Sequence, residues 1–197
     1  MGIYIIALLA IVILGFLINP NNTPKKRKIY LIIVFGMLTI ISAVRSYKVG
    51  IDTEQFVNAF KYINSLPFIN SFNVRYEVGF VIFCRLLGIF SDNIQFFIIA
   101  ISLIIMPLIG RFIYKNSNDV VMSSILFITL NQYAMYMNAS RQAIAIAIIL
   151  FGYDFLKDNK FIKYVLCVLL ASLFHQTAII MLVLIPLRKL KYSNKMY

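Results

Sequence analysis

Arg141 and Gln142 stand at the start of a long apolar run, in the stretch MNASRQAIAIA at residues 137–147. An arginine in the lipid core is costly, so such a residue usually lines a cavity or lies at the membrane interface. Other ionisable side chains that could act with this arginine are spread along the chain: Arg45, Asp52, Glu77 and His175. Guanidinium groups bind oxyanions, and carboxylates and imidazoles exchange protons. These residue types suit acid–base chemistry beside an anion, if the fold brings them together.

The composition indicates which class of fold must position these residues. The chain has 197 residues, of which 61% are hydrophobic and 13% are charged, whereas a soluble domain averages about 25% charged residues. Several stretches of roughly 16–25 residues are nearly free of charge, about the length that a helix needs to cross a hydrocarbon core. We therefore predict an all-α, polytopic membrane helical bundle that forms one domain over residues 1–197.

Some functional classes find no support in the sequence. The net charge is +12, but the basic residues form short clusters between apolar runs, so nucleic acid is not an expected partner. There is no glycine-rich phosphate loop, zinc-ligand spacing or nucleophile elbow, and we predict neither a cofactor nor a metal. Cys84 and Cys167 lie inside apolar runs and are interpreted as packing residues.

The cations predict how the chain is laid across the membrane, because Lys and Arg in short loops mark the cytoplasmic side. Lys25–Lys28 place the first loop inside, so residues 45–75, which are too polar to span, form a loop on the outer face. Asp52 with Gln55 resembles a capping box that opens an amphipathic helix in this loop. Its apolar face would hold Phe56, Val57, Phe60 and Ile63.

Two layouts differ in the treatment of Tyr76–Phe90, a short apolar segment that carries Glu77 and Arg85. In the preferred layout this segment lies in the outer interface, and Tyr164–Leu187 forms a broken helical hairpin that turns at His175. In the alternative layout both segments cross the membrane, which puts the basic loop at residues 157–163 outside. The preferred layout keeps most cations inside and collects the acidic residues, arginines and histidine on the outer face.

Each candidate residue also has a purely structural interpretation. Asp52 could serve only as a helix cap, and Arg45 could extend from a helix end to the interface. Glu77 could simply be a polar residue at the membrane interface, and His175 could make a buried hydrogen bond. Arg141 and Gln142 have the weakest structural explanation, because their Ala and Ile neighbours offer no obvious partner.

Four stretches, in this order, resemble the EpsG family of membrane proteins, which is related in role to the O-antigen and capsule polymerases. They are RSYKVGIDTEQF at 45–56, RYEVGF at 75–80, SRQAIAIAIILFGYDFL at 140–156 and LCVLLASLFHQTAIIMLVLIPL at 166–187. The chain departs from the family at Ser140, where a methionine is usual before Arg-Gln. Family members are also longer, so we expect this chain to be the N-terminal part of a longer protein.

The resemblance implies a multi-pass protein of the bacterial cytoplasmic membrane that works on the outer face. Such proteins join oligosaccharide units carried on undecaprenyl diphosphate, in exopolysaccharide, capsule or O-antigen synthesis. The resemblance then assigns Arg45 and Arg141 to the diphosphate and Gln142 to hydrogen bonds with sugar or phosphate. Asp52, Glu77 and His175 are the candidate bases, with Asp52 first.

Two other functions are compatible with the same residues. A transporter or flippase for lipid-linked sugars would need the arginines without a base, and many transporters show internal repeats, which this sequence lacks. A non-catalytic subunit that works with other polysaccharide assembly proteins is the third possibility.

Overall fold

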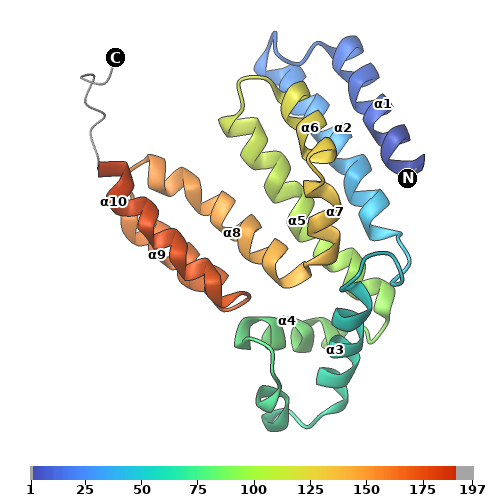
Figure 1. The fold of residues 1–197 in the computed structure, drawn as a ribbon, viewed down its shortest axis with the longest axis vertical. Helices are drawn as coiled ribbons and strands as arrows, with labels where there is room; N and C mark the ends of the chain where they lie inside the picture. The colour runs from blue at the N-terminus through green and yellow to red at the C-terminus, as the bar shows by residue number, and fades with distance from the viewer. Residues whose placement is uncertain (1, 190–197) are drawn as a thin grey trace.

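The computed structural model describes residues 2–189, apart from the side chain of Lys189, and every regular element within this range is helical. The elements are α1 (Gly2–Ile18), α2 (Pro24–Ala43), α3 (Thr53–Ser65), η1 (Ile69–Asn73), α4 (Val78–Phe90), α5 (Ile94–Asn116), α6 (Val120–Thr129), α7 (Gln132–Asn138), α8 (Ser140–Lys157), α9 (Phe161–Ser172), η2 (Gln176–Val183) and α10 (Leu184–Lys189). The predicted all-α class is confirmed (Figure 1).

The helices α2, α5 and α8 form the centre of the bundle, with α5 packed against both of the others. At one end of this bundle, Arg27 donates to the Ser117 carbonyl, and Lys157 Nζ donates to Asn116 Oδ1 at 2.6 Å. We call this the basic end, because Lys25–Lys28 open α2 there. The opposite end, which we call the site end, holds the end of α2 and the starts of α5 and α8.

The last helices form a hairpin that turns at His175. The helix α9 ends at Ser172, and η2 and α10 run back beside it (Figure 1). Arg188, near the end of the hairpin, donates to the Lys157 carbonyl and to Asn159 Oδ1, the latter at 3.2 Å. Both flanks of the hairpin therefore lie at the basic end. The predicted break at His175 is confirmed, because the stretch forms two antiparallel segments rather than one straight helix.

The segment between α2 and α5 covers the site end. The predicted apolar face of α3 is confirmed, since Phe56, Val57, Phe60 and Ile63 are all buried. The 13-residue helix α4 lies across the bundle end rather than along α5 (Figure 1). Arg85 of α4 donates to the Asn64 and Leu66 carbonyls, so it satisfies backbone groups that the end of α3 leaves open.

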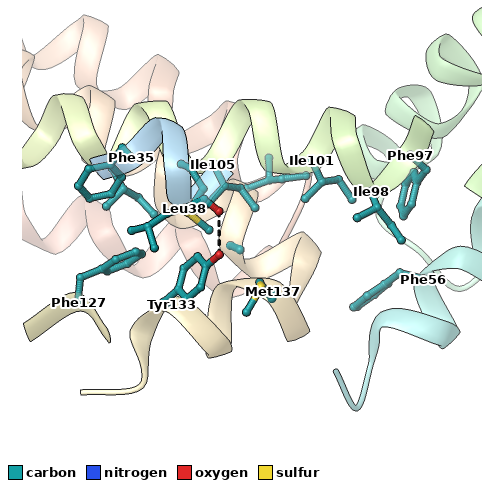
Figure 2. Close-up of a cluster of buried hydrophobic side chains, with 14 of the residues drawn as sticks. Phe35, Leu38, Phe56, Phe97, Ile98, Ile101, Ile105, Phe127, Tyr133 and Met137 are labelled. Atoms are coloured by element: carbon teal, nitrogen blue, oxygen red, sulfur yellow. Dashed lines mark hydrogen bonds between the residues drawn. The ribbon is translucent and has the colours of Figure 1, made fainter. Parts of the chain in front are cut away.

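One continuous apolar core joins this cover to the bundle. Figure 2 shows the core side chains extending from Phe35 and Phe127 to Phe97 and Phe56. Tyr133 is buried in this core, and its hydroxyl donates to the Leu38 carbonyl at 2.7 Å (Figure 2). Stacking of Phe60 on Phe97, with 4.8 Å between ring centroids, fixes α3 on α5. The position of α3 is thus set by the bundle core.

Among the described residues, α5 is the one helix that is both long and apolar enough to cross a membrane. The pair α6 and α7 reaches that length only across a bend of 56°. The apolar stretch from Val120 to Met137 is thus divided between two helices. Asn131 adopts a left-handed conformation, with φ of 60°, which ends the regular helix.

Candidate functional site

Three of the predicted site residues meet at the site end. The Arg141 guanidinium forms an ion pair with the Glu77 carboxylate, and His175 Nδ1 lies 4.0 Å from the other carboxylate oxygen. These residues come from the start of α8, the residue before α4 and the turn of the hairpin. The Glu77 side chain is 14% exposed and that of Arg141 is 23% exposed, so the pair is largely shielded from solvent. We call these three residues the Arg141 cluster.

The break between α7 and α8 points Arg141 at this cluster. Ala139 separates the two helices, and its carbonyl accepts the Ala143 amide at 2.8 Å as α8 begins. The Arg141 guanidinium then lies over two rings, 5.5 Å from the Phe56 centroid and 5.1 Å from that of Tyr76. Its Nε is buried and has no hydrogen-bond partner among residues 2–189. The arginine is thus held in place by a carboxylate and two rings, and one of its donors is unused.

Gly79 brings Glu77 to the hairpin turn. Its amide donates to the Leu173 carbonyl at 2.9 Å, and a Cβ at this position would lie 2.7 Å from both the Leu173 Cβ and its carbonyl oxygen. Only glycine permits this approach. Because Glu77 lies two residues before Gly79 and His175 two residues after Leu173, this contact sets the spacing between carboxylate and imidazole. Sequence reasoning missed this role, although RYEVGF contains the residue.

Arg45 lies in a separate, structural position. It is buried, and its guanidinium donates to the Ser42 carbonyl and hydroxyl at 2.9 and 2.7 Å and to the Met137 carbonyl at 2.9 Å. Burial lowers the pKa of Arg45 to about 10, which leaves it protonated at neutral pH. The Thr53 hydroxyl donates to the same Met137 carbonyl at 3.2 Å. Arg45 therefore ties the ends of α2 and α7 together, and Thr53 joins the start of α3 to the same carbonyl. The alternative in which Arg45 extends to the interface does not fit its burial.

Asp52 and Gln142 do not join the Arg141 cluster. Asp52 precedes α3, but its side chain makes no capping hydrogen bond. The reason is a turn that begins at Gly50, where φ is +107°; it leaves Asp52 in a helical conformation rather than the extended one of a side-chain cap. The expected capping box is wrong. Gln142 is exposed, and no hydrogen bond or ion pair links the side chain of either residue to another described residue.

A polar cleft of about 750 Å³ lies beside the cluster, between α3 and residues 73–76. Its polar and aromatic lining residues are Glu54, Gln55, Asn58, Tyr62, Asn73, Arg75 and Tyr76. Tyr76 links the cleft to the cluster, because the Arg141 and Arg75 guanidinium groups lie 5.1 and 5.5 Å from the centre of its ring. Rings, amides and charged groups in one hollow suit a polyhydroxylated ligand. Sequence reasoning missed this cleft, although the spacing of 54, 55, 58 and 62 marks one face of a helix.

No metal-binding arrangement is evident in the described part of the chain, where no three His, Cys, Asp or Glu side chains lie close enough to hold an ion.

The fold and site define an all-helical, strongly apolar protein with an arginine–carboxylate–histidine cluster at one end of its bundle. The EpsG family model matches residues 28–197, which is most of the chain, and the chain belongs to that family. The match includes every segment that contributes to the Arg141 cluster and the cleft. Membership indicates a membrane protein of a polysaccharide-polymerase-like family. No curated protein and no solved structure matches the chain.

Proposed function

We propose that the protein is a glycosyltransferase that joins oligosaccharide units carried on undecaprenyl diphosphate, as a multi-pass protein of the bacterial cytoplasmic membrane. The observation that carries this proposal is the Arg141 cluster, formed at the bundle end opposite Lys25–Lys28 and Lys157. The positive-inside rule turns the basic end toward the cytoplasm, so the cluster and the cleft face outward. Such a position suits a substrate whose sugars are outside and whose lipid remains in the bilayer.

In the proposed reaction, a hydroxyl of the acceptor sugar attacks the anomeric carbon of the donor. The bond between that carbon and the diphosphate oxygen breaks, and the diphosphate leaves with the electron pair. Arg141 binds the diphosphate and stabilises its developing charge. The hydroxyl proton passes to His175, which Glu77 orients and whose positive charge Glu77 then balances.

Binding of the diphosphate changes the partner of the Glu77 carboxylate from Arg141 to His175. In the free protein its carboxylate neutralises Arg141 within a partly buried site. An incoming phosphate competes for the guanidinium, so the carboxylate can turn to His175 as the imidazole takes up a proton. The polar cleft holds sugar residues next to this centre, with Tyr76 as the shared wall.

The remaining candidates take supporting roles in this proposal. Arg45 acts through the Met137 carbonyl and is a positioning residue rather than a diphosphate ligand. Gln142, exposed beside Arg141, hydrogen-bonds sugar or phosphate. Asp52 remains an alternative base, but the geometry favours Glu77 and His175, because these two side chains already face each other.

The experiment compares Arg141→Ala, Glu77→Gln and the control Lys61→Ala in cells whose polysaccharide is resolved by chain length. Lys61 is exposed on α3, so its loss should leave the site intact. We expect both site variants to shorten the polymer strongly while single repeat units still reach the outer face. Units stranded inside would instead indicate a flippase. Normal chain length in both site variants would refute a catalytic cluster and favour an accessory subunit.

A further inference from the structure

A second hollow lies on the side of the bundle, between α2 and α5. It measures about 670 Å³, and most of its wall is apolar: Ile32, Phe35, Gly36, Ile40, Leu103 and Pro107. Lys28, Arg111 and Tyr114 also line it, from the turns of α2 and α5 that lie toward the basic end. We call it the lateral groove. It is apolar along its length and cationic at one end.

The glycines explain why the groove is open. A Cβ at Gly110 would lie 2.9 Å from Phe35 Cγ, so glycine lets α2 and α5 approach closely. A Cβ at Gly36 would meet no atom within 4 Å, so the surface is hollow beside this residue. Close contact at one glycine and empty space at the other leave a hollow between the two helices.

The cationic end carries more positive charge than its neighbours neutralise. Arg111, Lys115 and Lys157 share one carboxylate, that of Asp154, at 2.6, 3.0 and 3.7 Å. Arg111 Nη1 is buried and has no partner in the described part of the chain. Lys28 is exposed, and no hydrogen bond or ion pair joins its side chain to another residue of 2–189. An anion placed between Lys28 and Arg111 would find charge and donors that the protein leaves unused.

We propose that the lateral groove binds an anionic phospholipid, with its phosphate between Lys28 and Arg111 and one acyl chain along Gly36 and Leu103. A helix that crosses the membrane presents such a groove to the bilayer, and α5 has the required length and composition. Clusters of Lys and Arg at the cytoplasmic level attract anionic headgroups. The headgroup position lies toward the bundle end opposite the Arg141 cluster, so lipid binding does not depend on the proposed catalysis.

The test uses the absence of tryptophan from the sequence. The full chain carrying Ile32→Trp is reconstituted in vesicles, and its fluorescence is quenched by brominated phosphatidylglycerol or brominated phosphatidylcholine. We expect the anionic lipid to bind at the introduced indole at least about fivefold more tightly, the effect of roughly one cation at a membrane surface. The control Phe16→Trp lies in α1, exposed near the same bundle end but outside the groove, and should show no preference.

A second pair of variants locates the headgroup. In the Ile32→Trp background, Lys28→Ala should reduce the preference about fivefold, whereas Lys26→Ala, in the same turn but outside the groove, should preserve it. Gly36→Leu should fill the groove and lower quenching by both lipids at Ile32→Trp but not at Phe16→Trp. Equal quenching by the two lipids would overturn the proposal. An indole that neither lipid quenches would also overturn it, because protein would then cover the groove. In a competition experiment, quenching that only added undecaprenyl phosphate relieves would overturn it too, because the groove would then bind the lipid carrier.

Discussion

The Gly79 amide and the Leu173 carbonyl form a hydrogen bond of 2.9 Å that joins the start of α4 to the turn of the hairpin. The two residues are far apart in sequence, yet their backbones touch because Gly79 has no side chain. Glu77 and His175 owe their proximity to this contact. The site therefore depends on a residue that takes no part in its chemistry.

Gly79→Ala should separate α4 from the hairpin. The added methyl group would lie 2.7 Å from the Leu173 backbone oxygen, and overpacking of this kind costs about 1–3 kcal/mol. We expect a lower unfolding temperature of the purified protein and a loss of polymer length in cells. Gly2→Ala is the control, because its methyl group enters open space and Gly2 lies outside the site and the groove. Equal behaviour of the two variants would contradict a packing role for Gly79.

Glu77→Gln should lower the polymerisation rate about a hundredfold, the usual effect of removing a group that assists proton transfer. The double variant with Glu77→Gln and Arg141→Lys should lose much less rate than the product of the two single-variant losses. The reason is that both changes weaken the same ion pair. Polymer synthesis by purified variants from lipid-linked repeat units gives the four rates. Fully multiplicative losses would mean that the two residues act independently.

The arrangement of the bundle ends predicts the sidedness of single cysteines in a background without Cys84 and Cys167. Lys26→Cys and Lys163→Cys should react only from the cytoplasmic side, since both flanks of the hairpin lie at the basic end. Lys48→Cys, beyond the site end of α2, should react only from outside. Intact cells treated with a membrane-impermeant maleimide report this directly. External labelling at position 163 would exclude the proposed orientation of the hairpin.

Asp119 should make stability depend on pH. Its carboxylate caps α6 by accepting the amides of Val121 and Met122 at 2.9 and 3.0 Å. Hydrogen bonds from the Asn21 side chain and the Met122 amide hold the pKa of Asp119 below its ordinary value. The stabilisation is therefore complete above the unfolded-state pKa and is lost as the pH falls through the lower, folded-state pKa.

Asp119→Ala should remove this pH dependence and cost about 1 kcal/mol at neutral pH, the usual value of a helix N-cap. Thermal unfolding in detergent at several pH values measures both effects. Asn118→Ala, at the neighbouring exposed position, should leave both unchanged. A similar acid sensitivity in the Asp119→Ala variant would show that another group is responsible.

Features encoded locally could be predicted from the sequence. The apolar spacing of Phe56, Phe60 and Ile63 was sufficient to locate the buried face of α3, and the cations on both sides of His175 were sufficient to locate the hairpin. The pairing of Arg141 with Glu77 was not predictable, because nothing in one sequence links two residues 64 positions apart.

Two features of the backbone conformation were not predicted. The chain bends at Asn131 and turns at Gly50, and both residues have a positive φ that residue types only suggest. The turn at Gly50 is the reason that Asp52 does not form the expected capping box. The partners of Arg45 were missed for a related reason: the main-chain carbonyls of Ser42 and Met137 carry no signature in the sequence.

The hairpin enters and leaves by the same end of the bundle, because Arg188 lies against Lys157 and Asn159. Under the proposed orientation, such an element starts and ends on the same side of the bilayer, so it adds no net membrane crossing. A longer or shorter hairpin would still return the chain to the basic end. The depth at which His175 lies could therefore change without changing the orientation of the helices that precede it.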